Sequence, residues 1–430
     1  MKEEKFDVII VGGGLSGSTA AYVLAQAGLE VLVIERGTYC GAKNVTGGRL
    51  YGHSLEKVIP NFADEAPIER KIVKEHISMM TESGATTIAF GTDRLRQPEC
   101  ASYSVLRAKF DKWLAEKAEA AGAVYVCGVR ADELICQEGR VIGVNCGGEE
   151  MFADVVILAD GVNSLLAQKA GLKPELDPSQ VAVGVKEIIA LDEQTICDRF
   201  GVSPGEGAAW MFAGDPTGGN IGGGFLYTNK ESVSLGIVTT VGDIGRCDMS
   251  VPDMVERLKN HPAVKPLIAG GKLVEYSAHL VSEGGYTMVP TLWDSGVLVT
   301  GDAAAFVVNL GYTVRGMDFA IESGRLAAEA VITAKKAGDF SADSLSVYQD
   351  LLEGSSVIKD LKQYQHMPEF MECHEIFNEL PHLAEDIMES LFVVDGSDPQ
   401  SLIMKMLPAV ARNGGLVGLA KVLMRAMEAM

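Results

Sequence analysis

The stretch Phe6-Asp-Val-Ile-Ile-Val11, followed by Gly12-Gly-Gly-Leu-Ser-Gly17, decides the fold at the start of the chain. Its first half is an apolar, β-branched run, which is typical of a strand buried in a parallel sheet. Its second half is a GxGxxG sequence. We expect a small-residue helix over Ser18–Ala27 and a second buried strand over Leu29–Ile34. This order predicts a strand–helix–strand unit that binds a dinucleotide.

Each position of the motif has a physical role. Gly12 makes the tight turn, Gly14 lets the backbone approach a pyrophosphate, and Gly17 lets the helix pack on the sheet. Leu15 and Ser16 lie in the same turn, at the helix end whose free N–H groups favour an anion. Glu35 ends the second strand beside Arg36. A carboxylate there accepts the two hydroxyls of an adenosine ribose and repels a 2′-phosphate. On this motif alone, FAD and NAD remain equal.

Two later turns favour FAD. The apolar strand Asp154–Ala159 ends in Asp160-Gly161, and the strand Gly296–Thr300 ends in Gly301-Asp302. A carboxylate in a strand–Gly-Asp–helix unit can hydrogen-bond to a ribitol hydroxyl. We predict a helix from about Thr313 to Ala330, so that Thr313 and Val314 lie at its N-terminus. The positive end of this helix would face the pyrimidine edge of a flavin and stabilise an anionic reduced flavin.

Composition excludes several classes of protein. The 430 residues carry 37 basic and 58 acidic side chains, a formal net charge of −21 that argues against a nucleic-acid partner. The eight cysteines include no CxxC pair, so we predict neither a zinc site nor an iron–sulfur ligand set. No signal peptide and no apolar run of transmembrane length is present. We therefore expect a cytoplasmic protein, and peripheral attachment to the inner face of the cell membrane stays open.

The motifs are far apart in the sequence, so the predicted cofactor domain is discontinuous. We assign residues 1–75, 104–180 and 286–340 to it, and residues 76–103 and 181–285 to a β-sheet domain for the substrate. Residues 341–430 form a helical C-terminal region. A glycine-rich stretch at 220–224 lacks the strand-before, helix-after context of a second nucleotide site, and we predict a turn between strands there.

The C-terminal region is rich in methionine and reverses the sign of the charge. Residues 401–430 carry four basic side chains and one acidic side chain. Apolar residues such as Leu423 and Met427 recur there at helical spacing, with Lys421 and Arg425 on another face. This pattern is typical of a helix at a membrane interface or in a protein groove, and equally of a helix that packs on its own domain. Three histidines spaced eight residues apart lack ligand geometry, so we predict no metal.

Several further segments carry a resemblance to a known family. They are residues 41–49 (GAKNVTGGR), 105–111 (VLRAKFD), 283–286 (EGGY) and 309–318 (NLGYTVRGMD). The chain resembles the FixC-type electron-transfer-flavoprotein:quinone oxidoreductases, within a superfamily that includes geranylgeranyl reductases and aromatic hydroxylases. The resemblance implies an α/β fold: a glutathione-reductase-type, Rossmann-like FAD-binding domain with an inserted β-sheet quinone domain and a helical C-terminal region. It also implies that Arg107 contacts FAD and that Lys43, Asn44, Val45 and Gly48 line the flavin ring. Without the family, Arg107 is simply a surface base before an amphipathic helix.

The resemblance implies an FAD-dependent oxidoreductase that passes electrons from a two-subunit electron-transfer flavoprotein to a membrane quinone. Single-chain members carry a cluster-binding ferredoxin-like domain, but no cysteine follows Cys373 here. The FixC-type pattern instead implies a separate small ferredoxin-like iron–sulfur subunit within a FixABCX-like complex. The sequence shows no Ser/His/Asp or Cys/His nucleophile system, and we leave the catalytic residues unassigned. We take Gly207–Phe212, Gly222–Tyr227 and Tyr286 as candidates for the quinone path. Tyr286 is equally a core residue. The alternatives are a prenyl double-bond reductase, an FAD monooxygenase and a flavin-binding assembly subunit that does not turn over.

Overall fold

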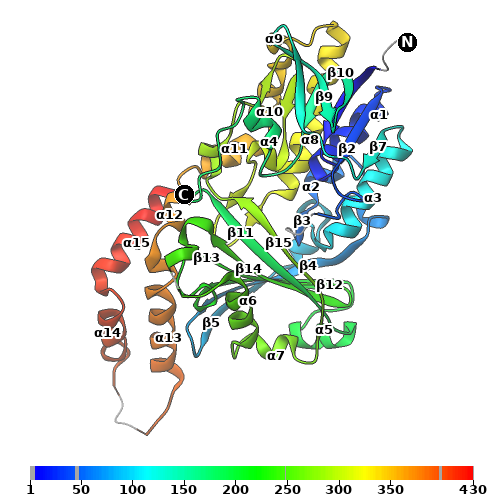
Figure 1. Cartoon of the computed structure of the whole chain (residues 1–430). Coiled ribbons are helices and arrows are strands. Elements are labelled where there is room, and N and C mark those ends of the chain that lie inside the picture. The colour runs from blue at the N-terminus through cyan, green and yellow to red at the C-terminus, as the bar shows by residue number, and fades with distance from the viewer. Residues whose placement is uncertain (1–4, 44–47, 247, 397–399, 430) are drawn as a thin grey trace.

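Two large sheets and a helical C-terminal arm make up the protein (Figure 1). The computed structural model describes residues 5–43, 48–246, 248–396 and 400–429. The predicted cofactor residues Asn44 and Val45 lie outside the described residues. The observed architecture is the mixed α/β arrangement predicted from the sequence.

The first sheet has eight strands, and its centre is parallel. Strands β17, β10, β1, β2 and β7 lie side by side in parallel, and a β8–β9 hairpin extends β10. The register Val8↔Val31 and Val8↔Val155 places β1 in the middle, where its apolar run is buried on both faces. The strands in spatial order are β16 (Trp293–Asp294), β17 (Val297–Val299), β10 (Glu149–Leu158), β1 (Lys5–Val11), β2 (Val31–Glu35) and β7 (Val124–Cys127), with β8 (Glu133–Gln137) and β9 (Arg140–Cys146) in the hairpin.

Three long helices pack along this sheet, and glycines let two of them approach closely. α1 (Leu15–Gln26) packs against α8 (Met317–Ala337) and α3 (Arg107–Ala120). A side chain at Gly324 of α8 would overlap the backbone of Ser16, and one at Gly17 would overlap the carbonyl of Gly12. α1 therefore begins directly at the glycine turn, three residues before the predicted start at Ser18.

The second sheet has nine strands and is antiparallel except where β12 meets β4. Helices α5 (Glu193–Phe200) and α6 (Val251–Asn260) contribute side chains to its own hydrophobic core. The strands in order are β15 (Lys272–Ser282), β11 (Val181–Ala190), β14 (Ser232–Thr240), β13 (Gly222–Thr228), β12 (Glu206–Gly214), β4 (Ile68–Met80), β6 (Ser102–Val105) and β3 (Arg49–Tyr51), with β5 (Ala85–Gly91) paired to β4.

Some local expectations differ from the structure. The helix predicted from about Thr313 begins only at Met317, because a small antiparallel pair, β18 (Val308–Asn309) and β19 (Val314–Arg315), occupies the preceding residues. The glycines at 222–224 are not in a turn but open strand β13. The second sheet also takes in β3 and most of β4, which lie in the range we assigned to the cofactor domain, so the proposed domain division stays a prediction.

The C-terminal region is helical. Its last three labelled helices, α13, α14 and α15, project from the body as an arm (Figure 1). Its first helices join the main core through buried Tyr348, Leu352 and Leu361. None of the described helices is both long and apolar enough to cross a membrane. The helices are α9 (Ala342–Leu345), α10 (Val347–Gly354), α11 (Ser356–Gln363), α12 (Met367–Met371), α13 (Glu379–Phe392), α14 (Leu402–Arg412) and α15 (Gly415–Ala429). Shorter helices elsewhere are α2 (His53–Glu56), α4 (Leu165–Lys169) and α7 (Lys265–Ile268).

Candidate functional site

A cavity of about 1200 Å³ lies between the two sheets. One wall is formed by the turns that follow β1, β2 and β10, and the other by strands β11 to β15 of the second sheet. The cavity is larger than the roughly 300–1,000 Å³ of an ordinary ligand pocket, so it has room for a cofactor and a second molecule.

Most of the predicted cofactor residues line this cavity. Gly17 and Gly301 lie just behind the wall, where they allow the close packing of α1 on its neighbours. Thr313 is not on the wall; because the helix starts later than predicted, its hydroxyl instead contacts the hydroxyl of Tyr51. The predicted residues on the wall are Gly12, Gly14, Leu15, Ser16, Glu35, Arg36, Lys43, Gly48, Arg107, Asp160, Gly161, Asp302 and Val314.

The first glycine turn leaves the start of α1 open to the cavity. Gly12 has φ +105°, and a side chain there would overlap the carbonyl of Ala159 on β10. Gly14 precedes α1, and among the described residues no side chain caps this first turn. The N–H groups of the turn therefore offer a site for a pyrophosphate.

Glu35 is held in place by the backbone on both sides. The amide of Gly13 donates to its Oε2 at 2.9 Å, and the amide of Gly37 donates to its Oε1 at 2.6 Å. Each carboxylate oxygen can accept more than one hydrogen bond. The carboxylate is thus fixed at the cavity wall with acceptor capacity left for a ribose.

The buried side chain of Lys173 connects the Asp160 turn, which follows β10, to the Asp302 turn, which follows β17. Lys173 Nζ donates to the carbonyl of Val162 at 2.7 Å and to that of Ala303 at 3.0 Å. Burial lowers the pKa of Lys173, and the carboxylates of Asp160 and Asp302 oppose that shift. The two acidic turns therefore stand at a fixed separation, with a positive charge between them.

Arg107 begins α3 and points its charge into the same region. Its Nε and Nη2 contact the two oxygens of Asp111 at 2.6 and 2.8 Å, and its side chain is only 12% exposed. Burial raises the pKa of Asp302, and Arg107 opposes that shift. The view of Arg107 as a plain surface base is wrong, because it is a buried, positioned cation at the cavity wall.

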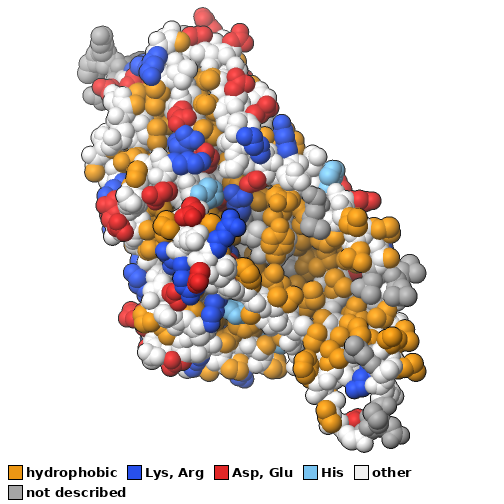
Figure 2. All heavy atoms as spheres, turned by 180° about the vertical axis from the view of Figure 1, so that it is seen from behind, with side chains coloured by type: hydrophobic (Ala, Val, Ile, Leu, Met, Phe, Trp, Pro, Cys, Tyr) orange, Lys and Arg blue, Asp and Glu red, His pale blue; other side chains and the backbone are white. Residues whose placement is uncertain are grey.

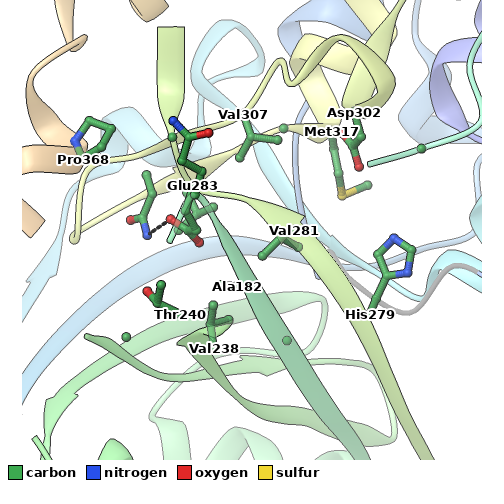
Figure 3. A pocket seen from close by; sticks show the side chains of 18 of the residues that line it. Ala182, Val238, Thr240, His279, Val281, Glu283, Asp302, Val307, Met317 and Pro368 are labelled. Carbon is green, nitrogen blue, oxygen red and sulfur yellow. Dashed lines mark hydrogen bonds between the residues drawn. The ribbon is translucent and has the colours of Figure 1, made fainter. Parts of the chain in front are cut away.

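Two basic side chains enter the cavity from the second sheet, and sequence reasoning missed both. Lys186 on β11 is only 4% exposed, and burial lowers its pKa. Burial also lowers the pKa of His279 on β15, while Asp302 across the cavity opposes that shift. Figure 3 shows His279 and Asp302 at the same end of the cavity, on opposite walls. The only available signal for Lys186 was the charged pair Lys186-Glu187 inside an otherwise apolar strand.

At the other end of the cavity, the second sheet and α12 place apolar side chains on the wall beside polar ones such as Glu283 and Asn309. Val238, Val281 and Ala182 line it from three strands of the second sheet, and Pro368 closes it from α12 (Figure 3). Of the predicted quinone-path residues, those on the wall are Met211, Phe212, Gly222, Gly223, Gly224, Phe225 and Tyr227. Tyr286 packs instead against the main core, with Lys362 over its ring.

Relatives of known sequence identify the family. The chain is 52% identical over 421 residues to the probable electron transfer flavoprotein-quinone oxidoreductase YdiS of Escherichia coli strain K12, covering 98% of both chains. It is 51% identical over 418 residues to Protein FixC of the same strain, covering 97% of this chain and 96% of that one. The chain belongs to the ETF-QO/FixC family.

Three family models match successive parts of the FixC-type chain. The "FAD dependent oxidoreductase" model matches residues 7–182, which carry most of the first sheet. The "ETF-QO, ubiquinone-binding" model matches residues 181–281, from β11 to β15. The "ETF-QO/FixC family C-terminal domain" model matches residues 367–430, from α12 to the arm. The resemblance to FixC-type proteins is therefore confirmed, and this FixC-family chain is an FAD-dependent oxidoreductase.

Solved structures share the fold of the FixC-type chain. A geranylgeranyl bacteriochlorophyll reductase-like protein from Thermoplasma acidophilum aligns over the full length of both chains with a TM-score of 0.72 and 23% identity. The halogenase PltM in complex with FAD aligns over 90% of this chain and 80% of that chain, with a TM-score of 0.64 and 16% identity. These likenesses confirm the predicted fold class.

The residues on the wall fit FAD. The open N-terminus of α1 suits a pyrophosphate, Glu35 suits a ribose, and the cation Arg107 stands near the Asp302 turn. A side chain at Gly48 would fall on the ring of Tyr227, so this glycine keeps a narrow space beside that aromatic wall. FAD is the cofactor of this family member, as predicted from its sequence.

Proposed function

We propose that this protein passes electrons from a two-subunit electron-transfer flavoprotein to a membrane quinone. Within the site, Gly12, Glu35, Arg107 and Asp302 hold and orient the FAD. The flavin, when bound, supplies the two-electron chemistry. The strands of the second sheet provide an apolar seat for the quinone ring beside it.

The observation that carries this proposal is the two-sided cavity. One wall is made of dinucleotide-binding turns, and the opposite wall belongs to the segment that matches the ubiquinone-binding model. The apolar side chains at the far end suit a hydrophobic ring and its isoprenoid tail. The predicted quinone-path strands β12 and β13 contribute to this wall.

The C-terminal arm supports a role at the membrane surface. Leu423 and Met427 on α15 are 64% and 78% exposed, so part of the predicted apolar face is not covered by the protein's own body. Figure 2 shows hydrophobic side chains gathered over this part of the molecule. The same arm contributes Val422 to the cavity, and α13 packs on β5, which exposes Ile88 and Phe90. We propose that this apolar surface lies on the membrane and admits the quinone from it.

We further propose that the protein is one subunit of a FixABCX-like complex, with the iron–sulfur cluster on a small ferredoxin-like subunit. The relatives named after an electron transfer flavoprotein and FixC support this assignment. The strongly acidic chain is compatible with basic docking patches on its partners.

The donor half-reaction tests the proposed function. Purified FAD-loaded protein is mixed anaerobically with reduced electron-transfer flavoprotein or with NADPH, and the flavin absorbance is followed. Rapid bleaching by the flavoprotein and none by NADPH is expected. Rapid bleaching by NADPH, with oxygen uptake in air, would instead indicate a monooxygenase.

Two other outcomes would redirect the assignment. A mass increase of two on an added prenyl lipid would indicate a prenyl double-bond reductase, a function compatible with the long apolar cavity. Unchanged electron flux after removal of the flavin from the assembled complex would indicate an assembly subunit whose FAD does not turn over.

A further inference from the structure

Glu283 lines the cavity beside the β18–β19 hairpin, which follows the Asp302 turn. Glu283 directly follows β15, and its amide donates to the carbonyl of Gln180 at 2.8 Å, which fixes its backbone at the edge of β11. Its side chain lines the cavity. Figure 3 shows it among Val281, Ala182 and Pro368.

The hydrogen bonds of Asn309 define the two oxygens of this carboxyl group. Asn309 Oδ1 accepts from the amide of Gly311 at 2.9 Å, so its Nδ2 is the donor that contacts Glu283 Oε2, also at 2.9 Å. Oε2 is therefore an acceptor. Oε1 makes no hydrogen bond to any residue that the structure describes, and it is free to carry a proton toward a molecule in the cavity.

Quinone reduction needs such a proton. Conversion of a quinone to a quinol takes two electrons and two protons. A reduced flavin held in the site would supply both electrons and one proton, so one proton is left for the protein or water to provide. An apolar quinone seat excludes most water, so an acid on its wall is the nearest source.

We propose that Glu283 is the proton donor to the quinone, an inference that rests on the proposed function. The Oε1–H bond breaks as a quinone carbonyl oxygen takes the proton, and that C=O becomes C–OH. The Glu283 carboxylate then regains a proton from water. Electrons and atoms balance: reduced flavin anion, quinone and one proton give oxidised flavin and quinol.

The protonation equilibrium of Glu283 suits this task. Burial raises its pKa to about 7, and the hydrogen bond from Asn309 opposes the shift. A proton donor works best when its pKa lies near the working pH. No charged group among the described residues adds to this shift. The titratable and charged side chains that line the cavity from neighbouring elements are His279 on β15, Lys186 on β11, Asp243 and Arg246 after β14, Asp302 after β17, Tyr312 before β19, Glu369 on α12, and Glu372 and His374 beyond it.

Infrared spectroscopy of the FAD-loaded protein tests the proton without turnover. The carbonyl stretch of a protonated carboxyl group should be present in oxidised wild-type protein at pH 6 and disappear as the pH rises through about 7. Glu283→Gln should lack this titrating band. The amide oxygen of Gln still accepts from Asn309, so the variant should keep its fold and FAD. Glu149→Gln, an exposed acid on β10, is the matched control and should keep the band.

A single-turnover reaction tests the role of that proton. Chemically reduced, FAD-loaded protein is mixed anaerobically with a short-chain quinone across pH 5.5–9. Wild-type reoxidation should slow about tenfold per pH unit above the pKa of Glu283. Glu283→Gln should be about 100-fold slower at pH 6 and nearly independent of pH, since a positioned acid contributes about 10²–10⁴-fold.

The outcomes separate the two proposals. Wild-type protein that reacts with quinone while Glu283→Gln keeps the same rate and pH profile would overturn the role of Glu283 alone. Wild-type protein that shows the titrating band but never reacts with quinone would overturn the proposed function itself. Loss of both the band and the pH-dependent rate in Glu283→Gln, with Glu149→Gln unchanged, supports the proton donor.

Discussion

The two ends of the cavity are built on opposite principles. At the cofactor end, backbone turns are fixed by hydrogen bonds, as when the amides of Gly13 and Gly37 hold Glu35 and Lys173 bridges two turns. At the proposed quinone end, apolar strand faces provide much of the wall, and the polar side chain Glu283 is held mainly by Asn309. The adjacent arm leaves large apolar side chains in solvent.

This difference matches the two proposed occupants, FAD and a quinone, which need different kinds of contact. A cofactor that stays bound is held by directional contacts, each of which is costly to lose. A substrate that must enter, react and leave is better served by non-directional apolar contact. The predictions below test this contrast from its strongest point to its weakest.

The largest effect is expected at the first turn. Gly12→Ala adds a side chain at φ +105° that would overlap the carbonyl of Ala159, so FAD binding and folding should both fail or fall sharply. Gly28→Ala is the matched control, with φ +81° and nothing within 4 Å of the added atom. It should cost about 1–2 kcal/mol of unfolding free energy and keep FAD. Flavin content and thermal unfolding measure both; FAD-replete Gly12→Ala would contradict the role of this turn.

Asp302→Ala should lose FAD while the protein stays folded. Asp302 lines the cavity near the positive charges of Arg107 and Lys173. Its removal takes away a hydrogen-bond acceptor in the turn that follows β17. Asp294→Ala, which removes an exposed acid on β16 of the same sheet, should retain the cofactor. The measurement is the ratio of flavin to protein after purification. A stoichiometric ratio in Asp302→Ala would show that this carboxylate does not hold FAD.

At the apolar arm, charge should weaken membrane binding without disturbing the cofactor. Leu423→Asp combined with Met427→Asp removes two exposed side chains, each worth about 1.5–3 kcal/mol when buried in lipid. Binding to lipid vesicles in a sedimentation assay should weaken about 100-fold or more, with FAD content unchanged. Val124→Asp changes an exposed apolar residue on β7 and should bind as the wild type does. Equal vesicle binding by all three proteins would show that these side chains of the arm do not contact the membrane.

The smallest effect is expected at the contact between α15 and Glu375, which lies between α12 and α13. Lys421 on α15 donates to Glu375 Oε1 at 2.6 Å, and Cys373 donates to its Oε2 at 2.9 Å. These bonds, that of Cys373 first, lower the pKa of Glu375 from 4.5 to about 2. Their stabilisation is complete above pH 4.5 and is lost as the pH falls through about 2.

Hydrogen exchange measures this fastening. Glu375→Gln should speed exchange in α15 at pH 7 by an amount equal to at most about 1 kcal/mol, because the pair is partly exposed. Glu372→Gln changes a neighbouring acid that takes part in neither of these two bonds, and it serves as the control. Identical exchange in the wild type and Glu375→Gln would show that other contacts hold the arm.

The contrast between the two ends also explains what the sequence could predict. The turns at Gly12, Asp160 and Asp302 each lie directly between a strand and the next element, so the neighbouring sequence is enough to predict them. The positions of Lys186 and His279 depend on the register of β11 with β15, a pairing between strands about ninety residues apart that no local pattern reveals. The start of α8 was placed too early because the β18–β19 pair forms only in the folded chain.

We propose that one cavity seats FAD at its glycine turns and a quinone at its apolar end. A crystal structure of the FAD-loaded protein with a short-chain quinone tests it most directly. We predict the pyrophosphate at the N-terminus of α1, and the quinone ring against β11–β15 with a carbonyl oxygen facing Glu283. A quinone bound outside this cavity, or an FAD that fills the apolar end, would contradict the account.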